Sequence, residues 1–275
     1  MRWRKRFACE ICEGGGNVTG DRREFIRGGV ALGAFAATVG SAEDGAGIGK
    51  KRETVVYVSC HPDDLGGSVG TVIRLAQVYD VHVVEFTHGE RGLGESGYRD
   101  GTTARLRTAE DEAVCRAIGV PLHWCDEIDG EAFAGREACE RLAGLFRQLR
   151  PRAIITHWLL ETHCDHLMSA AAAIKAIDLA DLKPEIYFQE QEIQSRGFVP
   201  AYYVDVSDLT ERKRKIIELW ACQHGAQMAE RKIRTSVVNG WRIGGMENAE
   251  VFGVFPGTVT PGRSIFDALT GVRQA

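Results

Sequence analysis

Residues 55–64 read Val-Val-Tyr-Val-Ser-Cys-His-Pro-Asp-Asp, an apolar run that leads directly into an imidazole, a proline and two carboxylates. A short apolar run of this kind is typical of a buried strand in a parallel sheet. Ligands of open α/β sheets collect where the strands end, because the connecting loops separate there and leave a crevice. The stretch therefore predicts a parallel sheet with a polar site at its carboxyl edge.

The same pattern repeats along the chain. Short apolar or β-branched runs predict further strands, and the segments between them have helical spacing. The predicted strands are 54–60, 81–87, 121–124, 153–157, 185–188 and 202–206, and the predicted helices are 68–79, 103–118, 136–149, 165–177 and 207–228. We expect the glycine- and proline-rich stretch from residue 239 onward to wrap over the surface. The alternation indicates an α/β fold, a mainly parallel sheet with helices on both faces, in a single catalytic domain.

The composition is that of a globular protein, with 44% hydrophobic and 26% charged residues among 275. Residues 1–27 hold seven of the 34 basic and four of the 38 acidic residues, so the remainder has 27 against 34, a net charge of −7. An acidic body argues against binding to nucleic acids or anionic membranes. Of the eight cysteines, Cys9 and Cys12 form a lone C-x-x-C pair, and we expect most of the others to be small core residues.

The N-terminal segment, with its basic residues 1–27, is similar to a twin-arginine export signal. Arg22-Arg23 precedes the small apolar stretch 28–39, and residues 40–42 are small enough for cleavage. We therefore expect an export signal at 1–42, a linker at 43–53, a metal-dependent domain at 54–275, and a location in the periplasm or cell envelope. The stretch is too short and glycine-rich for a stable membrane span, unless an uncleaved signal acts as an anchor. The alternative is a disordered basic tail before an ordinary helix.

His61-Pro62-Asp63-Asp64 has the residue types of half a hydrolytic metal site. A catalytic zinc needs about three protein ligands from nitrogen, oxygen or sulfur, with water in the open position. His61 and Asp64 supply two ligands, and His166 is the natural third. Asp63 is then the free carboxylate beside the water, where it can act as general base. The alternative is a solvated turn that caps the next helix.

His163-Cys164-Asp165-His166 follows the predicted strand 153–157 and supplies the other half. His163 and His166 are three positions apart, so both can face one crevice, where one binds metal and the other donates to the reacting carbonyl oxygen. Asp165 can cap the following helix or orient one of the imidazoles. The alternative is a surface loop with ordinary histidines, and His157 alone is consistent with a structural role.

Residues 87–97 follow the second predicted strand and contain four glycines, which suggests a mobile rim loop over the site. We expect His88, a lone histidine in this loop, to face solvent. His82 and His123 lie inside strand-like runs and are expected to be core or edge residues. The sequence contains no Walker pattern, which argues against a nucleoside triphosphatase.

Together these motifs resemble the PIG-L/LmbE-like de-N-acetylase family, whose members remove acetyl groups from N-acetylglucosaminyl compounds. The likeness spans roughly 54–255. The family's A-H-P-D-D-E motif matches residues 60–65, its T-x-G-E motif matches residues 87–90, and its R-x-x-E motif matches Arg107 and Glu110. Its H-P-D-H motif matches residues 163–166, which follow Thr156-His157. Its H-x-x-Q motif matches His224 and Gln227, and its A-E-x-F motif matches residues 249–252.

The resemblance implies a Rossmann-like fold without dinucleotide binding, and zinc or another divalent metal held by His61, Asp64 and His166. It also implies that Asp63 is the base and that His163, supported by Asp165, polarises the oxyanion or donates a proton. The chain departs from the family pattern at two positions, where Leu65 replaces a glutamate and Cys164 replaces a proline. Both departures bear on substrate preference and metal affinity and leave the ligands and the base unchanged.

The function expected from these residues is zinc-dependent removal of an acetyl group from an N-acetylated sugar or glycoconjugate. One alternative is a zinc amidase for another amide, such as a sugar–thiol conjugate. A second is an exported carbohydrate-binding protein with a decayed site. The binding protein would be expected to have lost a ligand or the base, whereas His61, Asp63, Asp64 and His166 are all present.

Overall fold

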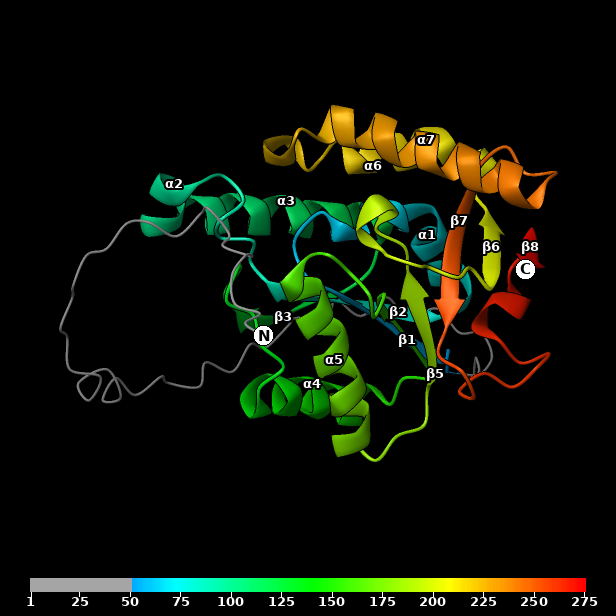
Figure 1. Ribbon diagram of the computed structural model, residues 1–275, viewed down its shortest axis with the longest axis horizontal. Helices are drawn as coiled ribbons and strands as arrows, with labels where there is room; N and C mark the ends of the chain where they lie inside the picture. Colours follow the sequence, from blue (N-terminus) through cyan, green and yellow to red (C-terminus); the bar gives the residue numbers. More distant parts are fainter. Residues whose placement is uncertain (1–50) are drawn as a thin grey trace, which may run out of the picture. The chain divides into compact units, whose positions relative to one another are not determined.

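An eight-stranded sheet runs through residues 51–275, the part of the chain that the computed structural model describes (Figure 1). Its spatial order is β3-β2-β1-β4-β5-β7-β6-β8. The strands are β1 Thr54–Ser59, β2 Asp80–Thr87, β3 Leu122–Glu127, β4 Ala153–His157, β5 Glu185–Gln189, β6 Tyr202–Asp205, β7 Ala249–Val254 and β8 Val272–Gln274. The first five strands in this order, β3, β2, β1, β4 and β5, pair in parallel. β7 pairs antiparallel with β5 and β6, and β8 pairs antiparallel with β6. The predicted α/β fold with a mainly parallel sheet is confirmed.

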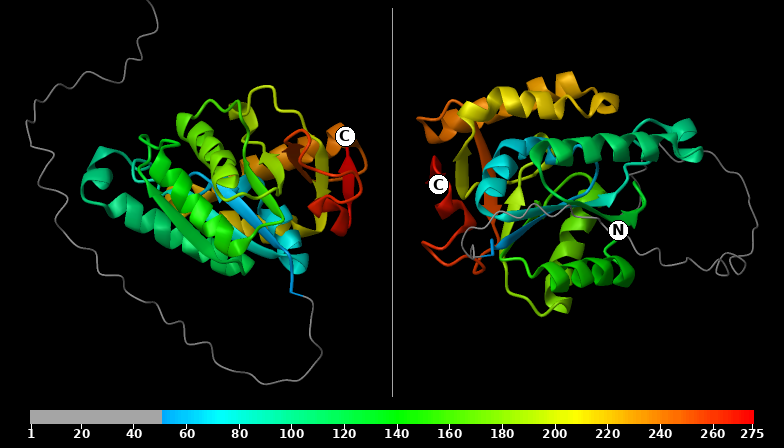
Figure 2. Two further views of the ribbon diagram at one scale, coloured as in Figure 1. Left: turned by 90° about the horizontal axis from the view of Figure 1, so that it is seen from below. Right: turned by 180° about the vertical axis from the view of Figure 1, so that it is seen from behind.

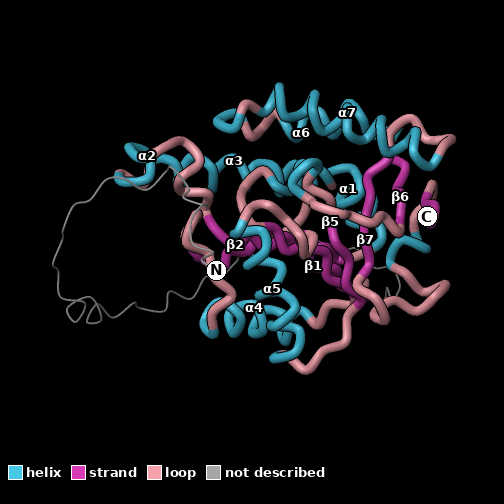
Figure 3. Tube along the Cα trace, in the orientation of Figure 1, coloured by secondary structure: helices cyan, strands magenta, loops and turns pink. Residues whose placement is uncertain are grey.

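Helices cover both faces of this sheet, as predicted (Figures 1 and 3). α4 and α5 pack on one face, and α1 and α3 pack on the other (Figure 2). On that second side, α6 packs against α1 and α3, and α7 packs against α6 and against β7 and β6. The helices are α1 Val69–Val78, α2 Glu95–Arg99, α3 Thr102–Ile118, α4 Arg136–Leu149, α5 Cys164–Leu179, α6 Thr210–Ile217 and α7 Gly225–Ile243. None of the helices within residues 51–275 has the length and apolar character needed to cross a membrane. The predicted export signal lies outside the described residues.

Two predictions for the last third of the chain were wrong. The predicted helix 207–228 is broken into α6 and α7, because the backbone turns at His224 (φ 57°) and a side chain at Gly225 would meet the Glu218 carbonyl oxygen at 2.8 Å. The stretch after 239 is not only a surface wrap, since β7 inserts between β5 and β6 and buries Phe252. Frequent glycine and proline around β7 concealed a six-residue strand.

Alternation along β1 explains why the sheet is buried on both sides. Val55 and Tyr57 belong to the core on the α1 and α3 side, whereas Val56 and Val58 belong to the core on the α4 and α5 side. All four side chains are fully buried. Successive residues of a strand point to opposite faces, so a run without polar residues can occupy only a central strand.

The strand order places a topological switch between β1 and β4. From β1 the chain continues toward β2 and β3, and from β4 it continues toward β5, on the other side. The loops that leave the two strands therefore diverge, and this divergence creates the ligand crevice of open α/β sheets. Residues 60–64 follow β1 and residues 158–163 follow β4, so both predicted clusters border this switch point.

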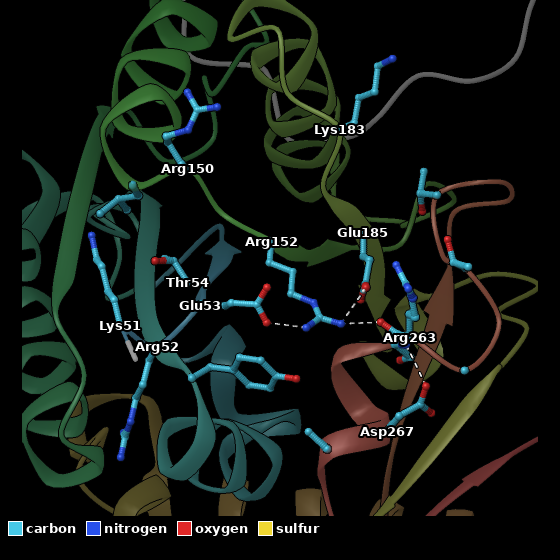
Figure 4. A pocket seen from close by; sticks show the side chains of 17 residues that line it. Lys51, Arg52, Glu53, Thr54, Arg150, Arg152, Lys183, Glu185, Arg263 and Asp267 are labelled. Carbon is cyan, nitrogen blue, oxygen red and sulfur yellow. Dashed lines mark hydrogen bonds and ion pairs between the residues drawn. The ribbon is translucent and has the colours of Figure 1, made fainter. Parts of the chain in front are cut away.

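The amino edge of the sheet holds a cavity of about 1060 Å³ around Arg152 (Figure 4). The Arg152 guanidinium forms ion pairs with Glu53 and Glu185 and donates to the Arg263 carbonyl oxygen. These contacts connect the residue before β1 with the start of β5 and with the C-terminal loop. Because β1 and β4 begin here and the histidine clusters follow their ends, this cavity is separate from the predicted metal site.

Candidate metal centre

The turn after β1 brings His61 and Asp64 together. The His61 backbone N–H donates to Asp64 Oδ2 at 2.9 Å, and His61 Nδ1 lies 3.2 Å from the same oxygen. Asp63, between them, has φ 120° and turns its side chain away toward α3. The two adjacent carboxylates therefore face different partners, as the sequence predicts.

The second cluster meets the first across the switch point. His166 Nε2 lies 3.2 Å from Asp64 Oδ2, and the ring centroids of His61 and His166 are 5.3 Å apart. The three proposed ligands are each at least nine-tenths buried. Although burial alone would lower the pKa of His166, the Asp64 carboxylate raises it to about 9. The structure thus brings together all three residues, and their role as ligands stays a prediction.

The donor atoms fit a divalent cation. Nitrogen atoms of His61, His163 and His166 lie within 4.8 Å of one another, and so do donor atoms of Asp64, His157 and His166. Imidazole nitrogens and a carboxylate oxygen are the donors that zinc and related transition metals accept in proteins. Asp64 connects the two groups, because its Oδ2 lies 3.2 Å from both His61 Nδ1 and His166 Nε2. Among the five residues of these groups, His163 is the most exposed.

Asp63 lies against Arg107 beside the ligand set. The Arg107 guanidinium donates to Asp63 Oδ1 at 2.9 Å and also to the Pro62 carbonyl oxygen. Burial raises the pKa of Asp63 to about 6, and the charge of Arg107 opposes this rise. A carboxylate with a pKa near neutrality is suited to accept a proton and release it within one catalytic cycle.

Residues 56–177 match the family model described as PIG-L: GlcNAc-PI de-N-acetylase. The match identifies a PIG-L domain at residues 56–177. A curated relative, 4-oxalmesaconate hydratase from Pseudomonas putida, is 25% identical in an alignment over 192 residues that covers 62% of this chain and 74% of the relative.

Solved structures share the fold of residues 51–275. N,N'-diacetylchitobiose deacetylase from Pyrococcus horikoshii has a TM-score of 0.65 at 24% identity, covering 77% of this chain and 88% of that one. The 4-carboxy-2-hydroxymuconate hydratase from Pseudomonas putida has a TM-score of 0.66 at 22% identity, covering 76% and 98%. At these identities the structural likeness establishes the fold and does not establish the reaction.

Asp165 occupies a different position from the one expected of a His163 support. Its backbone N–H donates to His163 Nδ1 at 3.3 Å, but its carboxylate accepts from the Gly130 backbone N–H at 2.6 Å and lies 3.4 Å from His61 Nε2. His163 is the N-cap of α5. In this PIG-L domain, Asp165 therefore reaches His163 through its backbone and reaches the proposed ligand His61 through its side chain.

Three further side chains belong to the site and were missed or undervalued from sequence. Asp129 Oδ1 lies 3.3 Å from His61 Nε2, His157 stacks on His166 with ring centroids 4.1 Å apart, and Glu161 Oε2 lies 3.5 Å from His166 Nδ1. Asp129 follows β3 at the same sheet edge, which was an available signal. Its backbone N–H donates to Glu90 of the T-x-G-E motif at 3.0 Å, so this motif holds the loop that carries Asp129.

The remaining histidines and the two departures from the family pattern lie outside the ligand set. His88 stacks on Trp124 at 4.1 Å and contacts Thr108 and Asp126 instead of facing solvent alone. Leu65 is fully buried in the apolar core, so it removes a carboxylate without placing another group in the site. The Cys164 thiol is exposed.

Two glycine patterns of the chain match other enzyme classes by sequence alone. Residues 66–70 read Gly-Gly-Ser-Val-Gly, the G-x-S-x-G of serine hydrolases, but Ser68 is buried and its hydroxyl donates to Gln189 at 3.5 Å, with no histidine among its hydrogen-bond partners within residues 51–275. Residues 92–97 match G-x-G-x-x-G, yet they open only the five-residue α2 in the loop after β2. Neither pattern has the structural context of its class.

Proposed function

We propose that this PIG-L domain is a metal-dependent hydrolase that removes an acetyl group from an N-acetylated sugar or glycoconjugate. The observation that carries the proposal is the position of Asp63, a partly exposed carboxylate with a raised pKa, between His61 and Asp64 in the turn that meets His166. The family description, GlcNAc-PI de-N-acetylase, and the deacetylase from Pyrococcus horikoshii support this reaction.

A divalent cation at this cluster, zinc in our proposal, would supply a Lewis acid and acidify a water molecule. Asp63 takes the proton of the attacking water and is held for this task by Arg107. The Nδ1 of His163 accepts a backbone N–H, so its ring proton resides on Nε2. Burial lowers the pKa of His163 and favours the neutral ring, whose Nε2–H can donate to the developing oxyanion.

The direct test is an assay of the purified chain with defined zinc content against a panel of N-acetylated sugars. Each turnover should release one primary amine and one acetate. Metal analysis of the same sample should find about one zinc per chain, as expected for one set of three ligands. A chain that binds one zinc but releases no amine from any N-acetylated sugar of the panel would refute the proposal.

A hydratase is the second candidate, because the hydratase from Pseudomonas putida is 25% identical to this chain. The same ligand set and base would then direct water to a carbon–carbon double bond of an unsaturated carboxylate. The two reactions have different signatures. Hydration of 4-oxalmesaconate would abolish its conjugated absorbance and release no amine, whereas deacetylation would release amine and acetate.

We also propose that residues 1–42 form a cleavable twin-arginine signal and residues 43–53 a linker, so that the domain acts in the periplasm or envelope. The support is the Arg22-Arg23 pair before a short apolar stretch. Cell fractionation of the full chain and of an Arg22→Lys/Arg23→Lys variant tests this. The variant should accumulate in the cytoplasm, and equal export of both would refute the signal.

A further inference from the structure

His166 presents its two ring nitrogens to two different carboxylates. Nε2 lies 3.2 Å from Asp64 Oδ2, on the side of the proposed metal, and Nδ1 lies 3.5 Å from Glu161 Oε2, on the opposite side. His166 Nδ1 and Glu161 Oε2 are both buried, and neither has a hydrogen-bond partner within the described part of the chain. Two unpartnered buried polar atoms that face each other indicate a contact with a purpose beyond packing.

The neighbouring rings fix the plane of His166 but not its orientation within that plane. His157 stacks on one side at 4.1 Å with an interplanar angle of 23°, and His163 stacks at 4.7 Å with an angle of 22°. A half-turn about the Cβ–Cγ bond keeps the ring in this plane and exchanges its nitrogens for carbons. Stacking alone therefore cannot keep Nε2 directed at the ligand set, and a polar partner at Nδ1 can.

Glu161 is held independently of His166. The Ser195 hydroxyl donates to Glu161 Oε1, and residues 161 and 195 form an isolated antiparallel bridge. On either side of this bridge, the Thr162 N–H donates to the Gln194 carbonyl at 3.0 Å, and the Arg196 N–H donates to the Leu160 carbonyl at 2.8 Å. The loop after β5 thus fixes the carboxylate that faces a ligand carried by α5.

We propose that Glu161 is a positioning residue for the metal site. Its Oε2 accepts the Nδ1–H of His166, which selects the tautomer with a free lone pair on Nε2 and directs that lone pair toward Asp64 and the ion. The proposal rests on the proposed function, since it requires His166 to be a ligand. Partners of this kind typically contribute about 10–100-fold to metal affinity.

Three variants of the full chain test this inference through zinc affinity, measured by competition with a chromophoric chelator. Glu161→Ala should bind zinc about 10–100-fold more weakly than wild type. In Glu161→Gln, the amide oxygen keeps accepting from Ser195 and the NH2 group faces His166 Nδ1, which favours the wrong tautomer, so this variant should bind zinc at least as weakly as Glu161→Ala. The matched control is Leu160→Ala, an exposed neighbour in the same loop, which should bind zinc like wild type.

Nitrogen-15 spectra of the metal-free protein with a neutral His166 ring give a second readout that a purely structural role would not change. Wild type should show the tautomer with the proton on Nδ1, and Glu161→Ala should show a mixture of the two tautomers. Equal zinc affinity in Glu161→Ala and Leu160→Ala would overturn the inference, even if Glu161→Ala lowers the melting temperature. Absence of zinc binding by wild type would instead overturn the proposed function.

Discussion

Asp63 and Arg107 lie 44 positions apart in the sequence, yet the Arg107 guanidinium donates to Asp63 Oδ1 at 2.9 Å. The same group donates to the Pro62 carbonyl and, at 3.2 Å, to the Gly89 carbonyl, so one buried arginine joins the loops after β1 and β2. Asp63 needs this support because its φ of 120° lies in a region that L-residues rarely occupy. Arg107 therefore controls both the place and the charge of the proposed base.

Replacing the base should stop turnover without removing the metal. Asp63→Asn keeps an oxygen for Arg107, and asparagine tolerates positive φ better than most residues, but an amide cannot accept the proton of water. We expect kcat to fall by about 10²–10⁴-fold with unchanged zinc content. Acetate release and metal analysis on one sample check both parts, and turnover close to that of wild type would reject Asp63 as base.

Replacing Arg107 by lysine should destabilise the loop that carries Asp63. Arg107→Lys keeps a positive charge but cannot donate to Asp63, Pro62 and Gly89 in the same fixed geometry. We expect a lower melting temperature and a lower kcat, with zinc still bound. Arg105→Lys, on the exposed side of α3, is the control and should change neither value. A fully active Arg107→Lys variant would show that the guanidinium contacts are dispensable.

Metal binding should stabilise the folded domain. The proposed ligands come from the turn after β1 and from α5, which meet only in the native fold, so zinc at 100 times its Kd should add about 2.7 kcal/mol to the free energy of unfolding. Melting curves with zinc and with a chelator measure this increment. His166→Ala should abolish it, and His123→Ala, outside the ligand set, should retain it. An increment that survives in His166→Ala would exclude this residue as a ligand.

Most of the parallel half of the fold was predictable, because its strands are short runs rich in apolar or β-branched residues between segments with helical spacing. α4 was predicted to the residue, and β4 likewise. The antiparallel half was harder to predict, since β7 lies among glycines and its neighbours are β5 and β6, far from it in sequence. Such pairings depend on tertiary contacts that local patterns do not encode.

The difference between local sequence patterns and tertiary contacts also explains which site residues could be predicted. His61, Asp63 and Asp64 are consecutive, and a strand end positions them, so their proximity follows from one local pattern. Asp129 and Glu161 reach the cluster from the loops after β3 and β4. Asp129 closely follows the end of β3, which was a usable signal. Nothing in the spacing marks Glu161, because the contact that orients it, with Ser195, comes from another segment.

The buried acid Asp111 should make stability depend on pH. Burial raises the pKa of Asp111 to about 7, and Trp220 Nε1 donates to its Oδ1 at 2.9 Å. Because the folded-state pKa is above the unfolded value near 3.9, its contribution is fully present below about pH 4 and is lost as the pH rises through about 7. Asp111→Asn keeps the acceptor for Trp220 and should remove this loss.

Urea unfolding between pH 4 and pH 8 checks this prediction. The stability of wild type relative to Asp111→Asn should decline across this range and level off above about pH 7. Asp181→Asn is the matched control, since Asp181 is exposed and its positive φ suits asparagine. A pH-independent difference between wild type and Asp111→Asn would show that the carboxyl is not protonated in the fold.

The buried ion pair of Lys213 and Glu250 should be costly to break from one side. Lys213 Nζ lies 2.8 Å from Glu250 Oε1, and both side chains are almost completely buried. Glu250 also accepts the backbone N–H groups of Gly70 and Thr71, so it fixes the start of α1, directly after the metal-binding turn. Lys213→Met would leave that carboxylate charged and unpaired, and we expect a loss of about 3–5 kcal/mol.

Neutralising the second partner should recover part of this loss, because Glu250→Gln still accepts one N–H and carries no charge. The double variant Lys213→Met/Glu250→Gln should therefore be more stable than Lys213→Met alone, although each change is destabilising in the wild-type background. Urea midpoints of the three variants measure the coupling, with Lys215→Met, exposed on α6, as control. Additive losses would mean that Glu250 anchors α1 without any energetic contribution from Lys213.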